Sequence, residues 1–286
     1  MKKYISTILL VLIFLCGLGL LLYPTLSDFV NQANQSKAIE TYENSVANLS
    51  KDDYKRIIED ARKYNEKIIS NEFPKDEKDL AGNNDYNNAL NLNNDGLMGY
   101  IKIDKIKVKL AIYHTVEEPV LQIGVGHMPM TSLPVGGEST HAVLTGHRGL
   151  PSAKLFSDLD ELEINDVFYV YVLDEILAYK IDKISVVEPT DTKELQIING
   201  EDHVTLVTCT PYGVNTHRLL IRGVRVPYES TIADMSNVSN DALIINPEQV
   251  AAFIAAPILV IILAVILYKS RKAITIEKLK ESEESK

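Results

Sequence analysis

Cys209 and Arg218 lie in the two arms of a predicted β-hairpin. Cys209 ends the β-rich run Thr205–Thr208, and the turn-forming sequence Thr-Pro-Tyr-Gly follows it. Arg218 opens the β-rich run that returns, so the hairpin is expected to place it opposite Cys209 at the rim of a sheet. A thiol beside a guanidinium at a strand end is typical of a nucleophile and its anion stabiliser.

A histidine supplies the third group that such chemistry needs. His147 follows the β-rich run Ala142–Leu144 inside the Gly-flanked turn Thr-Gly-His-Arg-Gly, so it is also expected at a sheet rim. A free thiol with a pKa of ~8.5 is mostly protonated at neutral pH, and a nearby base or positive field makes it more nucleophilic. His147 and Arg218 could provide both.

The other polar residues of these segments are interpreted as structural. Strand alternation points the side chain of His217 to the face opposite Arg218. Arg222 shares the face of Arg218 but lies ~13 Å further along the strand, at ~3.3 Å per residue. Arg148 is expected to face solvent. No Gly-rich phosphate loop or metal-ligand cluster stands out, so we expect no cofactor and no metal.

Composition excludes several classes of protein. The chain has 286 residues and a formal net charge of −10, which argues against nucleic acid as a partner. Its two cysteines are Cys16, in an apolar run, and Cys209, so a disulfide framework and a thiolate zinc site are excluded. A lone cysteine such as Cys209 is either an inert buried residue or a reactive thiol.

The first apolar run, residues 5–23, is expected to be a transmembrane anchor. It follows a short N-terminal segment, 1–4, that contains Lys2 and Lys3. At 1.5 Å per residue the run is long enough for a bilayer core of ~30 Å. A secretory signal peptide is the alternative, but the run exceeds a usual signal core and no small-x-small cleavage site follows it.

A second apolar run, residues 250–268, is expected to be another transmembrane helix. Lys269, Arg271 and Lys272 follow it at once and begin the tail 269–286. Positive residues at the outer ends of both runs predict that both termini are cytoplasmic and that everything between the spans is extracellular. We therefore expect a two-pass protein of the cell membrane.

The extracellular part divides into helical and β-rich segments. Apolar residues at helical spacing within 24–82 predict a helical hairpin that packs on the main domain, with Ser50 and Asp53 forming a cap between its helices. A loop, 83–96, leads to a β-rich domain, 97–227, and a polar stalk, 228–249, follows.

Short β-type runs separated by turn signals indicate an antiparallel-rich barrel or sandwich, so the fold is mainly β. One brief helix is expected at Ala153–Leu159. The predicted strands are Gly99–Ile103, Val108–Ile112, Ala142–Leu144, Val167–Val172, Ala178–Val187, Val204–Thr208 and Leu219–Val224.

The motifs around the three candidate residues resemble those of a known family. Thr-Leu-Val-Thr-Cys209, followed nine positions later by Arg218, resembles the TLxTC…R signature of sortases, and Thr-Gly-His147-Arg-Gly matches their catalytic-histidine motif. The segment 99–226 as a whole resembles a class C, pilin-polymerising sortase. The resemblance implies a closed eight-stranded β-barrel and catalytic roles for His147, Cys209 and Arg218.

The resemblance also implies a function. It describes a membrane-anchored cysteine transpeptidase of Gram-positive bacteria, which cleaves an LPxTG-like sorting signal between Thr and Gly. The acyl group then passes to a lysine amine of another pilin subunit. Two anchors favour this class over the housekeeping type, which usually has only the N-terminal one.

Three alternatives remain open at this stage. A housekeeping-type or sporulation-type sortase would attach proteins to peptidoglycan with the same three residues. A thiol protease would release the acyl group to water. A membrane-tethered binding module would carry an inert Cys209.

Class C sortases often carry a lid over the active site, built on an Asp-Pro-aromatic motif. In the loop 83–96 this chain has Asn84-Asp85-Tyr86 instead. The resemblance implies that Asp85 reaches toward Cys209 or Arg218 and that Tyr86 fills the apolar part of the groove. Because the proline is missing, an ordinary solvated connector is the alternative.

Overall fold

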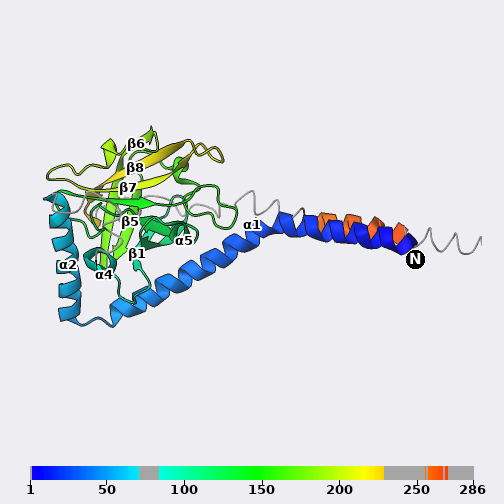
Figure 1. The fold of residues 1–286 in the computed structure, drawn as a ribbon, viewed down its shortest axis with the longest axis horizontal. Helices are drawn as coiled ribbons and strands as arrows, with labels where there is room; N and C mark the ends of the chain where they lie inside the picture. Colours follow the sequence, from blue (N-terminus) through cyan, green and yellow to red (C-terminus); the bar gives the residue numbers. More distant parts are fainter. Residues whose placement is uncertain (1, 71–83, 229–254, 256, 267, 270–286) are drawn as a thin grey trace, which may run out of the picture. The chain divides into compact units, whose positions relative to one another are not determined.

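The structure is a computed structural model, which describes residues 2–70, 84–228, 255, 257–266 and 268–269 (Figure 1). The β-rich domain and the helices that pack on it belong to one compact unit that begins at Asp28. The apolar helices near the two ends of the chain belong to another unit.

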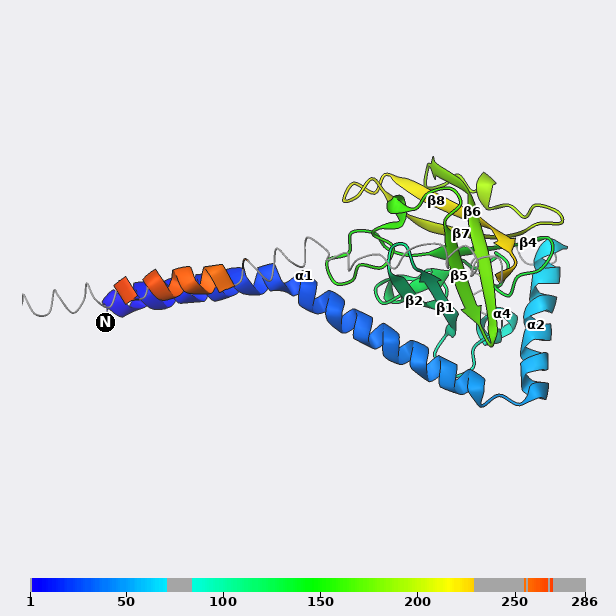
Figure 2. The ribbon, with the colours of Figure 1, turned by 180° about the vertical axis from the view of Figure 1, so that it is seen from behind.

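Eight strands close into a barrel in the order β1-β2-β3-β4-β7-β8-β6-β5 (Figures 1 and 2). The predicted mainly-β, closed eight-stranded barrel is therefore confirmed. Its strands are β1 (Leu97–Ile103), β2 (Val108–His114), β3 (Val125–His127), β4 (Thr140–Thr145), β5 (Val167–Val172), β6 (Glu175–Val187), β7 (Asp202–Thr210) and β8 (His217–Val226).

The strand pairing puts the ends of β4 and β7 side by side. These two strands are parallel neighbours, as are β2 and β3, while the other pairs are antiparallel. All seven predicted runs fall inside observed strands. Strand β3 was not predicted, because three residues are too few to show an alternating pattern.

Alternation separates an inner from an outer face on β4, β7 and β8. Leu144, Leu206 and Leu219 belong to the main core inside the barrel. A separate buried cluster, formed by Val143, Val207 and Leu220, lies on the outer face. Residues at even spacing from the second set share that outer face.

The predicted helical segment forms two helices joined by a short turn, α1 (Lys2–Ala47) and α2 (Lys51–Ile69). Ser50 is the N-cap of α2, and its hydroxyl oxygen accepts a hydrogen bond from the backbone N–H of Asp53 at 3.1 Å. Tyr42 of α1 is buried, where its hydroxyl donates to the carbonyl of Met98 at 2.9 Å. The Tyr42 bond joins the C-terminal part of α1 to β1.

Helix α2 packs on the barrel through its apolar stripe. Ala61 and Tyr64 are buried in the main core. The Asn65 side chain exchanges two hydrogen bonds with the backbone of Leu133, at 3.1 and 2.7 Å. A buried amide whose donor and acceptor are both satisfied fixes the helix in one position.

The prediction of a helix at Ala153–Leu159 is wrong. Leu155 has a φ of 42°, which interrupts helical geometry, and only a single 3-10 turn, Leu159–Glu161, forms. Leu155 and Phe156 are instead buried in the main core.

Among the described residues, one helix is long and apolar enough to cross a membrane. It is α1 from Thr7 onward. The apolar helix Pro257–Ile266 is shorter. Parts of the expected second span, 250–268, and the expected stalk after Tyr228 lie outside the described residues.

Candidate active site

Cys209 and Arg218 face each other across the β7–β8 hairpin. They are direct register partners in the antiparallel pair, as the sequence predicts. Both are half-buried and lie two positions from Val207 and Leu220 respectively, so they share the outer face of the barrel. Side chains of directly opposed residues are within reach of one another.

His147 lies where β4 ends beside β7. Thr145 is the register partner of Val207, and His147 and Cys209 each lie two residues further along. The backbone N–H of Gly146 donates to the carbonyl of Val207 at 3.0 Å, and the Thr208 hydroxyl donates to the carbonyl of Gly146 at 2.8 Å. The segment that follows β4 and the end of β7 are therefore held side by side where they leave the sheet.

Gly146 is required by the packing beneath His147. A Cβ atom at this position would lie 2.7 Å from the ring of Phe156, which is wholly buried. The backbone N–H of Phe156 also donates to the carbonyl of His147 at 3.1 Å. Phe156 therefore packs against Gly146 and bonds to the backbone of His147, which fixes the position of the histidine backbone.

The imidazole of His147 contacts a carboxylate from the β2–β3 connection. Its Nε2 lies 3.3 Å from Oε2 of Glu118, the first residue of α5 (Glu118–Leu121). A hydrogen bond from Gln122 and the neighbouring His147 hold the pKa of Glu118 below its usual value. Glu118 was not predicted, because no motif links a residue of this loop to His147.

The guanidinium of Arg218 is not neutralised by a carboxylate among the described residues. Its Nη1 donates to the carbonyls of Asn215 and His217 at 3.3 and 3.1 Å. Arg222 differs, because its Nε donates to Oδ1 of Asp182 at 3.1 Å in a two-pronged ion pair. The positive charge beside Cys209 is therefore available to a ligand.

A small apolar cluster lies on the same outer face, two residues from Cys209 and Arg218. Val143, Val207 and Leu220 are its buried members, and the partly buried side chains of Met128, Val187 and Leu195 pack against them. The next outer-face residues away from Cys209 on these strands are polar: His141, Thr205 and Arg222. Within the described part of the chain, no group of three or more His, Cys, Asp or Glu residues is arranged to hold a metal ion.

Comparison with known proteins agrees with this geometry. A family model described as a sortase domain matches residues 101–226. Sortase C1 from Streptococcus agalactiae is 48% identical, with a TM-score of 0.63, over 67% of this chain and 98% of that one. The chain belongs to the sortase family.

Two further relatives carry the names sortase C and Sortase A. Sortase C from Clostridium perfringens is 39% identical, with a TM-score of 0.59, over 67% of this sortase and 99% of that chain. The curated Sortase A of Bacillus anthracis is 25% identical over 222 residues, which are 78% of this chain and 95% of that one. This sortase is thus a cysteine transpeptidase, as predicted.

The expectation that Arg148 of this sortase faces solvent is wrong. Its side chain is only 7% exposed and forms an ion pair with Asp160. The sequence shows an arginine in a turn, but its partner comes from a later segment that alternation and turn rules do not place.

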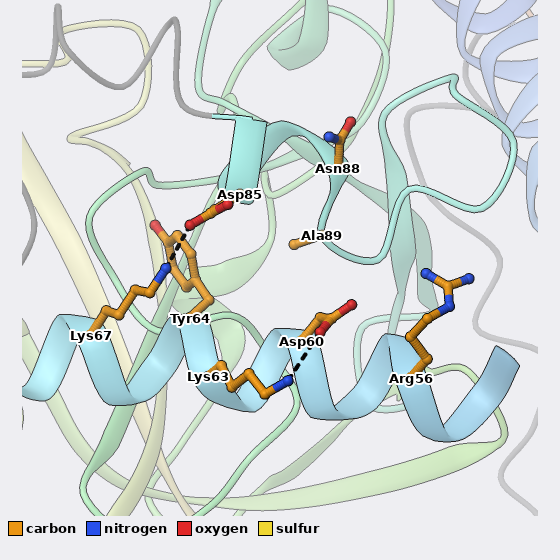
Figure 3. A pocket seen from close by; sticks show the side chains of 8 residues that line it. All are labelled: Arg56, Asp60, Lys63, Tyr64, Lys67, Asp85, Asn88 and Ala89. Atoms are coloured by element: carbon orange, nitrogen blue, oxygen red, sulfur yellow. Dashed lines mark hydrogen bonds and ion pairs between the residues drawn. The ribbon is translucent and has the colours of Figure 1, made fainter. Parts of the chain in front are cut away.

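The expected lid formed by Asp85 and Tyr86 is also wrong in this structure. These residues belong to α4 (Asn84–Asn88), and Tyr86 is buried, with its hydroxyl 3.1 Å from Nδ1 of His127. Asp85 pairs with Lys67 of α2 at 2.6 Å, at the edge of a cavity of about 350 Å³ between α2 and α4 (Figure 3). Both side chains therefore have partners in α2 and the barrel core rather than Cys209.

Proposed function

We propose that this sortase polymerises pilin by joining a sorting signal to a lysine of another subunit. The observation that carries the proposal is the convergence of three strand ends. Cys209 and Arg218 are register partners, and His147 leaves the adjacent parallel strand at the same level. A nucleophile, an anion stabiliser and a proton carrier are the groups that acyl transfer requires.

The first step forms a thioester. The Cys209 thiolate attacks the carbonyl carbon of the threonine in an LPxTG-like signal, and Arg218 donates hydrogen bonds to the oxyanion that develops. The C–N bond to glycine then breaks as His147 gives a proton to the departing amine. The chain that begins with glycine leaves, and the threonyl group stays on sulfur.

The second step transfers the acyl group to the acceptor. The ε-amine of a pilin lysine attacks the thioester carbonyl and passes a proton to His147. The C–S bond breaks, Cys209 leaves as thiolate, and an isopeptide bond joins the two subunits. The proton that His147 released in the first step is thereby recovered.

The apolar cluster beside Cys209 suits the first residues of the signal. The leucine and proline of such a motif are apolar, and the partly exposed side chains of Met128, Val187 and Leu195 surround the buried cluster that lies two residues from Cys209. The related Clostridium perfringens sortase C has been solved with its C-terminal cell wall sorting motif. We propose the same class of substrate here.

We propose a two-pass membrane topology for this enzyme. Helix α1 supplies an apolar length sufficient for the first span. The second apolar run, 250–268, is followed by three positive residues, and Lys2 and Lys3 precede the first. This distribution favours cytoplasmic termini and an extracellular barrel.

The test of the catalytic proposal uses the full chain in detergent and an internally quenched LPxTG peptide with an added lysine-containing acceptor. Cys209→Ala is expected to form no product while its circular dichroism remains that of the parent. Cys16→Ala, which removes the other cysteine, serves as the matched control and should retain full activity. Product formation above background by folded Cys209→Ala would overturn the assignment.

A second candidate function is attachment of proteins to peptidoglycan, which the likeness to Sortase A of Bacillus anthracis favours. Electrophoresis of surface extracts from a strain that lacks the gene separates the two functions. Polymerisation predicts loss of a covalent ladder of high mass. Loss of a single anchored band with the ladder intact would favour wall attachment.

A further inference from the structure

Arg148 is a buried arginine that the three proposed catalytic roles do not use. Its side chain is 7% exposed and pairs with Asp160, whose own side chain is half exposed. Its Nη1 donates to the hydroxyl of Thr210 at 3.2 Å. The guanidinium carbon lies 5.8 Å from the centre of the Tyr212 ring, within the range of a cation–π contact.

These contacts join the two loops that carry His147 and Cys209. Arg148 follows His147 directly, and its acceptor Thr210 follows Cys209 directly. The hydrogen bond between them therefore joins the residue after His147 to the residue after Cys209. Gly146, the residue before His147, is already joined to β7 by two hydrogen bonds.

Gly149, the residue after Arg148, makes further contacts between these two loops. Gly149 has a φ of +73°, and a Cβ atom there would lie 3.2 Å from the Tyr212 ring. Its N–H donates to the hydroxyl of Ser157 at 3.1 Å. The ring of Tyr212 thus packs on the backbone after His147, although Tyr212 as a whole is largely exposed.

Burial of Arg148 lowers the stability of the fold, so a contribution to stability does not explain why an arginine occupies this position. Its Nε is buried and has no hydrogen-bond partner among the described residues. A buried donor left unpaired is destabilising, because it loses its hydrogen bond to water and gains none in the protein. A hydrophobic residue would fill the same space without that penalty, although it could not bond Asp160 and Thr210 together.

We propose that Arg148 is a positioning residue that fixes His147 relative to Cys209. Its planar fork bonds Asp160 on one side and Thr210 on the other, which a point-like ammonium cannot reproduce. The inference rests on the roles proposed for His147 and Cys209. Misplacement of reacting groups by 1 Å costs about a hundredfold in rate, so the effect on turnover is expected to be large.

The test measures turnover of the quenched peptide by full-length Arg148→Ala, with and without guanidinium ion at a low, non-denaturing concentration. Arg225→Ala is the matched control, because Arg225 also lies near a carboxylate, Asp202 at 3.9 Å, and a tyrosine ring, Tyr179 at 5.6 Å. It sits near the other end of β8.

We expect Arg148→Ala to lower kcat about a hundredfold with KM changed less than about threefold, and guanidinium to restore at least about tenfold. Arg225→Ala should keep its turnover and show no response to guanidinium. Turnover of Arg148→Ala within about threefold of the parent would overturn this inference alone, provided that Cys209→Ala is inactive. Equal losses in both arginine variants, with no rescue of either, would also overturn it.

A second pair of variants tests the link if Arg148→Ala does not fold. Thr210→Val removes the acceptor hydroxyl and keeps the shape, while Thr210→Ser keeps the hydroxyl. We expect Thr210→Val to lose about tenfold in kcat/KM, which is about 1.4 kcal/mol, and Thr210→Ser to stay near the parent. Equal activity of the two variants would contradict the proposal.

Discussion

Two arginines on the same face of β8 have opposite surroundings. Arg218 and Arg222 lie four residues apart on one face of the strand. Arg222 forms a two-pronged ion pair with Asp182, whereas the guanidinium of Arg218 donates hydrogen bonds only to backbone carbonyls within the described part of the chain. One guanidinium is neutralised inside the structure, and the other is left for a ligand.

This difference separates a structural arginine from a functional one better than position does. A guanidinium already bonded to a carboxylate has little of its field and few donors left for an oxyanion. A guanidinium held by carbonyls keeps its net charge and remains oriented. Arg218 fits the second description and lies opposite Cys209.

The largest effect is expected from Arg218→Lys. Lysine retains the charge but lacks the planar fork that bonds an oxyanion and the peptide together. Loss of one such donor lowers turnover by about 10²–10³. Peptide turnover by the full chain measures this effect, and activity within about threefold of the parent would remove Arg218 from the mechanism.

The second prediction concerns how the stability of the protein near Arg222 depends on pH. The pKa of His141 is lowered to about 4, mainly by burial and to a smaller extent by the nearby His203 and Arg222, while the hydrogen bond to the Gln196 carbonyl and the charge of Asp182 oppose this shift. The unfolded pKa is about 6.5, so the unfolded state binds a proton first on acidification. The contribution of neutral His141 is present above pH 6.5 and is lost as the pH falls toward 4.

Thermal unfolding of the full chain, measured at several values between pH 6.5 and 4, tests whether stability falls on acidification. The decrease in the free energy of unfolding attributable to His141 is on the order of 2–3 kcal/mol. His141→Gln should show a smaller dependence of its melting temperature on pH than the parent. Identical dependences would show that His141 is not the group that titrates.

The hairpin and its register could be predicted because the information is local. Alternation, a turn signal and nine residues of spacing are sufficient to place Arg218 opposite Cys209. The burial of Arg148 could not be predicted, since it depends on Asp160 and Tyr212 in other segments. Tyr86 was misassigned for a similar reason, because its buried partner His127 lies in a strand too short to predict.

A third prediction gives Arg218 a partner like that of Arg222. Val187 of β6 is the register partner of Arg218, so Val187→Asp would place a carboxylate beside the guanidinium. We expect turnover about tenfold below that of Val187→Asn, which controls for the lost apolar contact. The difference should shrink as ionic strength rises. Equal turnover of the two variants would show that the charge of Arg218 is not used.

The smallest effect is expected from Arg222→Lys. Its pair with Asp182 is partly exposed, so its replacement should lower the free energy of unfolding by about 1 kcal/mol or less. Peptide turnover should remain within about threefold of the parent. Denaturant unfolding and turnover, measured on one preparation, check both values, and damage equal to that of Arg218→Lys would overturn the comparison.

The central claim is tested most directly by a chloromethyl ketone made from the Leu-Pro-x-Thr part of the signal. The full chain is incubated with it, digested and mapped by mass spectrometry. We expect one adduct per chain, on Cys209, formed about 10²-fold more slowly in Arg218→Lys and at the parental rate in Arg222→Lys. An unmodified Cys209, or equal slowing in the two variants, would contradict the account.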